Sequence, residues 1–210
     1  MDAAGLRQAI SGAMTEIVQY KDELRDLDTA LGDGDLGITV SLGAEAIVAA
    51  LAELPELSLD EVVRTCAKAF ANANPSTMAA LVAGALLAGS RLWANREDVS
   101  TSDASAFVAA AADSISRRGK SEVGDKTILD ALVPAGEALG TTEDAREALD
   151  RAIEAAQTAV VETAKLQSRR GRASWLQERS IGLKDPGASA LLRLLESWKA
   201  ANYDGVRVAD

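Results

Sequence analysis

The sequence predicts an all-α protein of about eight helices. Aromatic residues make up only 3% of the 210 residues, and alanine and leucine fill the gap, a composition that favours close-packed helices over sheets. Apolar residues recur every three to four positions through most of the chain, and no clean apolar-polar alternation extends over six positions. No Pro/Gly/Ser-rich linker or internal repeat divides the chain, so we expect one domain over residues 1–210.

The helices follow in order from their apolar spacing and their start signals. The first is predicted by Leu6, Ile10, Met14, Ile17 and Val18. Three further starts are indicated by a serine or threonine followed three residues later by an acidic residue, as in a capping box. These pairs are Ser58 with Glu61, Ser100 with Asp103, and Thr141 with Asp144.

Two further helices are predicted by almost continuous apolar stretches. The stretch from Met78 to Trp93 carries leucines on every face, which predicts a central helix covered by the others. It is shorter than the roughly 20 residues that span a membrane, and Asn74-Pro75-Ser76 marks its start. The last helix is expected over Ala188–Ala201, where four large apolar residues are in register.

The composition also excludes several functions. The formal net charge of -10 opposes the attraction on which general nucleic-acid binding depends, so we expect no nucleic-acid partner. No histidine is present, which excludes a Ser-His-Asp triad, an imidazole metal ligand and histidine phosphorylation. The single Cys66 cannot form an internal disulfide, and no targeting segment or 18-residue apolar run is found. We therefore expect a soluble, cytoplasmic protein without a membrane partner.

Four predicted loops are richer in Gly, Asp, Lys and Arg than connections require, and function is expected there. They are residues 26–37, 73–77, 117–127 and 168–187. The first contains Asp28, Asp33 and Asp35 among glycines. Clustered carboxylates repel one another, and Mg²⁺ is held by carboxylates together with water and phosphate oxygens. A metal site is one interpretation of this loop, and a solvated acidic turn is the other.

Three familiar motifs can be excluded in these loops. The spacing of Gly32, Gly34 and Gly37 matches a dinucleotide-binding pattern, but no strand precedes it and the intervening aspartates would repel phosphate. An EF-hand fails because Ile38 stands where the required glycine should be. The stretch around Gly119 resembles a P-loop, yet Asp125 replaces its lysine.

Two loops still favour anion binding. Backbone N–H groups near a helix start could bind an anion in the third loop, although a simple helix cap accounts for it equally well. The fourth loop carries four arginines in an acidic chain, at positions 169, 170, 172 and 179. Arginine binds phosphate oxygens through paired hydrogen bonds, so nucleotide recognition and surface charge balancing are both open interpretations. Together the loops contain the groups that phosphoryl transfer needs.

With these loops in view, nearly the whole chain resembles the L subunit of dihydroxyacetone kinase. The most specific blocks are Asp28-x4-Asp33-Gly34-Asp35-Leu36-Gly37, Gly124-Asp125-Lys126-Thr127-Ile128-Leu129-Asp130-Ala131-Leu132-Val133-Pro134-Ala135, and Gly171-Arg172-Ala173-Ser174-Trp175-Leu176 with Glu178-Arg179-Ser180 and Asp185-Pro186-Gly187-Ala188. The resemblance implies a single-domain barrel of eight antiparallel helices, with ADP or ATP and two Mg²⁺ ions bound at one end.

The resemblance also implies the roles of individual residues. Asp28, Asp33 and Asp35 would hold the ions and, with Arg172, serve catalysis. The nucleotide contacts would be Leu36, Gly37, Ile38, Thr39, Pro75, Ser76, Gly119, Ile128, Arg172, Asp185, Pro186 and Gly187. The terminal phosphoryl group would go to a hydroxyl of a short-chain ketose, dihydroxyacetone first.

Partners follow from the same resemblance. In that family a histidine of a K subunit holds the substrate covalently, so a chain without histidine needs such a partner. A phosphotransferase-system protein rephosphorylates bound ADP in one branch, while ATP is the donor in the other. We also expect a homodimer.

Two positions depart from the family pattern and leave an alternative open. Leu36 stands where the family usually has histidine, and Asn74-Pro75-Ser76 replaces a glycine-rich turn. Pro75 removes a backbone donor and fixes φ, which would weaken contacts with phosphate. A diverged nucleotide-binding sensor or a kinase subunit for another small sugar is the alternative, and a helical adaptor is a remote third.

Overall fold

The computed structural model describes residues 1–53 and 58–204, and the regular elements in this part of the chain are all helices. It contains no strand, only an isolated bridge between Asp2 and Asp98. The prediction of an all-α fold is confirmed. The α-helices of these ranges are α1 (Ala3–Ile17), α2 (Lys21–Leu31), α3 (Leu36–Ala52), α4 (Leu59–Ala73), α5 (Thr77–Ser90), α6 (Thr101–Gly119), α7 (Leu129–Leu139), α8 (Ala145–Thr163) and α9 (Pro186–Lys199).

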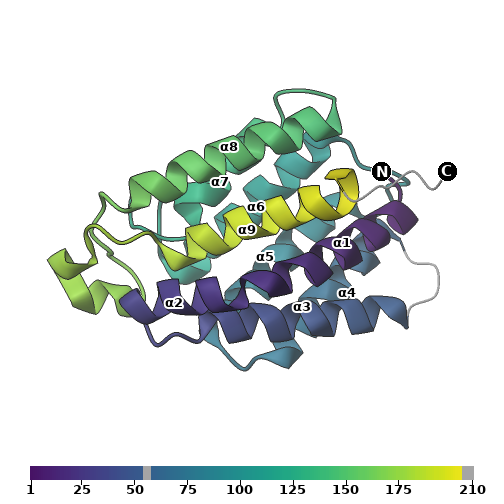
Figure 1. Ribbon diagram of the computed structural model, residues 1–210. Coiled ribbons are helices and arrows are strands. Elements are labelled where there is room, and N and C mark those ends of the chain that lie inside the picture. Colours follow the sequence, from purple (N-terminus) through teal and green to yellow (C-terminus); the bar gives the residue numbers. More distant parts are fainter. Residues whose placement is uncertain (54–57, 205–210) are drawn as a thin grey trace.

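The helices form a closed ring of antiparallel neighbours (Figure 1). Helices α1 and α2 are separated only by the 3₁₀ turn Val18–Tyr20, so together they make one bent member of the ring. The ring then runs from this member through α3 to α9 in chain order and closes where α9 packs against α1. Eight members result, as the sequence and the family resemblance predict.

The core is filled mainly by small and aliphatic side chains in two clusters. One lies between α6, α7, α8 and α9 and includes Leu129, Ala152 and Leu192. The other lies between α1, α3 and α4 and includes Leu51, Val62 and the ring of Trp93. Alanine at so many helix contacts lets the axes approach closely, which explains the scarcity of aromatic residues.

Helix α5 is a member of the ring and not a central helix, so that prediction is wrong. It packs between α4 and α6, and Leu87 on its outer face is 42% exposed. The sequence misleads here because glycines, as well as large apolar residues, mediate its packing. Gly89 lies directly against the ring of Phe107, so α6 fits closely where a larger residue would hold it away.

Two helix boundaries differ from their predictions. Helix α8 is capped by Asp144, whose carboxylate accepts the Glu147 N–H at 2.8 Å, and not by Thr141. Helix α9 begins at Pro186, two residues before the expected start, because Asp185 caps it and proline is well suited to the first position. The capping boxes at Ser58 and Ser100 are confirmed.

The antiparallel ring determines where the loops lie. Successive connections alternate between the two ends of the barrel, so every second connection returns to the same end (Figure 1). The connections α2–α3, α4–α5, α6–α7 and α8–α9 all share one end, and these contain the four loops in which function is predicted. Among residues 1–53 and 58–204, no helix combines the length and the apolar character that crossing a membrane requires.

Candidate functional site

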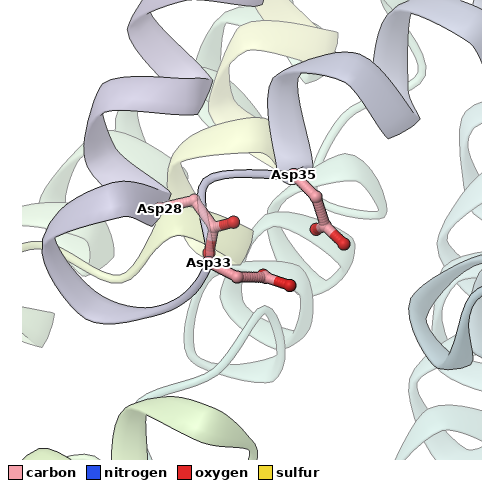
Figure 2. Close-up of side chains that lie close together, drawn as sticks. All are labelled: Asp28, Asp33 and Asp35. Atoms are coloured by element: carbon pink, nitrogen blue, oxygen red, sulfur yellow. The ribbon is translucent and has the colours of Figure 1, made fainter.

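Three aspartates converge at the loop end of the barrel. Each of Asp28, Asp33 and Asp35 offers a carboxylate oxygen, and these oxygens all lie within 4.8 Å of one another. Figure 2 shows the carboxylates directed into a common space from the end of α2, the connecting loop and the start of α3. Oxygen ligands at this spacing suit a hard divalent cation, which would relieve the repulsion between them.

The local backbone builds this cluster. Asp28 lies in the last turn of α2, because the helix extends to Leu31 beyond the predicted start of the loop. Its carboxylate accepts the Leu36 N–H at 3.2 Å and so fixes the start of α3. Gly34 has φ of +75°, a conformation that glycine adopts without strain. The chain therefore reverses direction over residues 32–35, which brings Asp35 close to Asp28.

Arg172 extends from another part of the chain to the same cluster. It begins the 3₁₀ helix Arg172–Ser180 in the α8–α9 connection, and its guanidinium pairs with the carboxylate of Asp33. Both side chains are about half exposed. The guanidinium of Arg172 thus balances part of the negative charge of the aspartates, at a residue that we expect to hold a metal ion.

Two other arginines of that connection lie at Asp125. Arg170 donates from Nε to Asp125 Oδ2 at 2.8 Å, and Arg169 lies 4.0 Å from the other carboxylate oxygen. Burial acts to raise the pKa of Asp125, but the hydrogen bonds from Arg170 and the Glu122 amide outweigh it and lower that pKa. Arg169 and Arg170 therefore pair with a carboxylate of the chain itself, Asp125.

The altered turn before α5 is tied to the start of α3. Asn74 is buried and donates from Nδ2 to the Thr39 carbonyl oxygen at 3.0 Å. Ser76 caps α5 by accepting the Ala79 N–H at 3.1 Å, while Pro75 is exposed. Thr39 itself is 5% exposed, whereas Ile38 beside it is 47% exposed. The turn therefore lies next to the first turn of α3.

The remaining predicted contacts lie where the α6–α7 and α8–α9 connections meet. A Cβ added to Gly187 would come within 3.4 Å of the Ile128 amide nitrogen, so these two residues are adjacent. Asp185 caps α9 by accepting the Ala188 N–H at 2.7 Å. Gly119 is the last residue of α6 and is helical, beyond the predicted start of its loop.

Most of the predicted site residues thus form three groups at the loop end of the barrel, and Gly119 belongs to none of them. The aspartates with Arg172 form the first, Thr39 with the turn at residues 74–76 the second, and Ile128 with residues 185–187 the third. Leu36 is buried beside the first group.

One residue of this region was not predicted from the sequence. Lys126 is 2% exposed and has φ of +62°, and its ammonium donates to two backbone carbonyl groups. A lysine between aspartate and threonine in a polar loop is normally solvated. Only its partners, 40 and 54 residues further along the chain, account for its burial.

Asp185 gives a pH-dependent prediction. Burial raises its pKa to about 7 from 3.8; the proximity of Asp130 also raises it, while the Ala188 N–H and Lys126 act in the opposite direction. A pKa raised by folding gives a contribution to stability that is complete below about pH 4 and is lost as the pH rises to about 7. Asp185→Asn keeps the cap and removes the titration. The free energy of unfolding of the wild type should therefore fall relative to that of the variant, by at most about 4 kcal/mol.

Urea unfolding of both proteins at several pH values between 4 and 8 tests this prediction. If the free energies of unfolding of the wild type and of Asp185→Asn change with pH in the same way, Asp185 does not titrate between pH 4 and 8.

Similarity to known proteins agrees with the fold. The DAK2 domain model matches residues 30–200. The chain therefore belongs to the DAK2 domain family, and the resemblance to the dihydroxyacetone kinase L subunit is confirmed.

The curated relatives include ADP-binding subunits DhaL of PEP-dependent dihydroxyacetone kinases. The Listeria innocua protein is 34% identical over 178 residues, covering 84% of this chain and 86% of the relative. The Escherichia coli protein is 28% identical over 177 residues, covering 82% and 84%. The L-erythrulose 1-kinase of Mycolicibacterium smegmatis is 34% identical over 181 residues, which cover 83% of this chain but 31% of that protein.

A solved structure supports the fold. The dihydroxyacetone kinase from C. freundii in complex with AMP-PNP and Mg²⁺ superposes with a TM-score of 0.72 at 22% sequence identity. The match covers 93% of this chain and 33% of the other, so the barrel corresponds to about one third of that larger protein. At this level of identity the likeness establishes the architecture.

Proposed function

We propose that this chain is the nucleotide-binding subunit of a short-chain ketose kinase. It transfers the terminal phosphoryl group of a Mg²⁺-bound nucleotide to a hydroxyl of dihydroxyacetone. The observation that carries the proposal is the convergence of Asp28, Asp33 and Asp35 at the loop end of the barrel, with Arg172 contacting Asp33. The names of the DhaL relatives, which are ADP-binding kinase subunits, support it.

In this proposal each group of residues has a separate task. The three aspartates hold two Mg²⁺ ions, which supply charge neutralisation for the phosphate oxygens of ADP or ATP. Arg172 leaves Asp33 to bind the phosphoryl oxygens, since its guanidinium offers parallel donors. The first turn of α3, over residues 36–39, and the turn with Pro75 and Ser76 contact the phosphates through backbone and hydroxyl groups. Gly119, Ile128 and residues 185–187 bind the rest of the nucleotide.

The acceptor requires a second protein. The chain has no histidine with which to hold a ketose covalently, so the proposal includes a K subunit that carries the substrate and meets the loop end of the barrel. Bound ADP would be rephosphorylated by a phosphotransferase-system protein, or ATP would be the donor directly. The PTS-dependent kinase subunit of Lactococcus lactis, 30% identical over 182 residues, makes the first route a specific candidate.

A second ketose has its own support. The matches to L-erythrulose kinases, at 34% and 31% identity, make L-erythrulose an alternative acceptor. The proline in the turn before α5 favours a third possibility, a paralogue that binds nucleotide without transferring phosphate, because Pro75 lacks an amide donor.

The first experiment determines what the purified protein carries. The nucleotide released on denaturation is identified by mass spectrometry, and Mg²⁺ is quantified in the same sample. About two Mg²⁺ per ADP would support a tightly held cofactor and donation by the phosphotransferase system. An empty protein that binds added Mg-ATP would support ATP as the donor. Failure to bind any nucleotide in excess Mg²⁺ would contradict the proposal.

Activity then separates kinase from sensor. The chain is combined with a K subunit and supplied with dihydroxyacetone or L-erythrulose, with ATP or with a phosphotransferase-system donor. Phosphorylated ketose in any combination identifies acceptor and donor. Nucleotide binding without turnover in every combination would favour the sensor.

A further inference from the structure

The segment that carries Arg172 is a loop whose two ends meet at a single side chain. We call residues 167–179 the arginine loop, which lies beside α2 at the end of the barrel (Figure 1). Lys126 Nζ donates to the carbonyl oxygen of Leu166 at 3.0 Å and to that of Ser180 at 2.5 Å. These carbonyl groups immediately precede and follow the arginine loop, so one ammonium group joins its base.

The neighbouring residue completes the junction. Asp125 accepts the Arg169 N–H through its carbonyl oxygen at 3.0 Å and Arg170 Nε through its carboxylate at 2.8 Å. Across the base, the Ser168 N–H donates to Ser180 Oγ at 2.9 Å. Residues 125 and 126 therefore hold both ends of the arginine loop against the α6–α7 connection.

Burial of the Lys126 ammonium group makes the loss of its hydrogen bonds costly. Lys126 is 2% exposed, and burial lowers the pKa of its ammonium group. A desolvated ammonium without its acceptors would be costly, so the loop base cannot open without water entering or the charge being lost. Lys126 also has φ of +62°, a backbone conformation that is uncommon for a residue other than glycine.

We propose that Lys126 is a positioning residue that clamps the base of the arginine loop and so holds Arg172 at the acidic cluster. Within the arginine loop, Arg172 alone forms an ion pair with that cluster among the described residues. Its position therefore depends on how the base is held. The consequence for nucleotide binding rests on the proposed function, but the clamp itself does not.

The direct test is limited trypsin digestion of the ligand-free protein. Lys126→Met keeps the length of the side chain and removes the donors. The arginine loop supplies its own cleavage sites at Arg169, Arg170, Arg172 and Arg179. We expect cleavage within the arginine loop of Lys126→Met to be at least tenfold faster than in the wild type, with the products identified by mass spectrometry. Unchanged cleavage would overturn the proposal.

A control separates local release from general destabilisation. Leu51→Ala removes a 1% exposed side chain at the opposite end of the barrel, and it should lower overall stability without accelerating cleavage in the arginine loop. Equal acceleration in Lys126→Met and Leu51→Ala would contradict the clamp. If circular dichroism shows that Lys126→Met does not fold, Lys126→Gln, which keeps a donor but is shorter, is measured instead.

A double-mutant cycle tests whether Lys126 acts through Arg172. Arg172→Ala should weaken Mg-nucleotide binding, measured by calorimetry, by roughly tenfold to a hundredfold, as loss of a charge-assisted contact. Lys126→Met should weaken it comparably, and the double variant should match Arg172→Ala within about twofold. If the affinity loss of the double variant is instead the product of the two single losses, Lys126 acts through a group other than Arg172. A wild type that binds no nucleotide would count against the proposed function, while the digestion still decides the clamp.

Discussion

Replacing Asp33 with alanine should abolish Mg²⁺-dependent nucleotide binding, with a loss of at least about a hundredfold in affinity. Asp33 supplies one of the three carboxylates that lie within 4.8 Å of one another, and it is the partner of Arg172. Without Asp33, the two remaining carboxylates supply less negative charge and one oxygen ligand fewer, so water must replace a charged ligand and the ions are held more weakly. Calorimetric titration with Mg-ADP and Mg-ATP measures the affinity.

The matched control is Asp26→Ala, seven residues earlier. Asp26 is exposed on α2 and pairs at 2.9 Å with Arg25, a surface contact of little energetic value. Its replacement should leave nucleotide affinity unchanged. A second readout requires no activity, since Mg-nucleotide should raise the melting temperature of the wild type and of Asp26→Ala but not that of Asp33→Ala. Unchanged nucleotide affinity of Asp33→Ala in excess Mg²⁺ would refute the metal assignment.

Gly37→Ala should have the largest effect on the fold. A Cβ at this position would overlap the carbonyl oxygen of Lys21 and lie 2.9 Å from the amide nitrogen of Arg25, both part of the backbone of α2. Backbone atoms cannot rotate away, so α3 must separate from α2. We expect the free energy of unfolding in urea to fall by about 3 kcal/mol or more.

The same displacement should reach the site. Asp35 and Leu36 immediately precede Gly37, so shifting the start of α3 moves a carboxylate of the cluster and weakens nucleotide binding. Gly5→Ala in the first turn of α1 is the control, because its Cβ would meet only side-chain atoms, at 3.2 and 3.3 Å. Its effect on stability should stay within about 1 kcal/mol. Similar unfolding curves for Gly37→Ala and the wild type would show that the α2–α3 contact adjusts without cost.

Gly37 also illustrates what a sequence pattern leaves undecided. The family resemblance implies that Gly37 contacts the nucleotide, whereas the structure adds a second reason for glycine in the contact with Lys21. The nucleotide contact and the contact with Lys21 would each favour glycine at position 37. A single sequence therefore identifies the special position but not which neighbour requires it.

Local signals were predicted best. The capping boxes at Ser58 and Ser100 were right because each depends on hydrogen bonds within four residues. The start of α8 was misplaced by the same reasoning. Thr141 was predicted as the cap with Asp144 as its acidic partner three residues later, whereas Asp144 itself caps the helix.

Non-local features could not be predicted in the same way. The exposure of Leu87 follows from closure of the ring, which no spacing of apolar residues encodes. The burial of Lys126 depends on carbonyl groups of Leu166 and Ser180, whose proximity only the fold provides. The four loops in which function is predicted were selected because their compositions are unusual, but their meeting at one end follows from the antiparallel order of the helices.

That order also has a consequence for how the barrel can be joined to other domains. Helix α1 begins and helix α9 ends at the end of the barrel opposite the aspartates (Figure 1). Helix α8, with 19 residues, is about 29 Å long at 1.5 Å per residue. An acceptor domain tethered to either helix would therefore need a connector of about nine extended residues to reach the end that carries the aspartates, or it would serve a neighbouring copy. Connector length would then set the effective concentration of acceptor at the site.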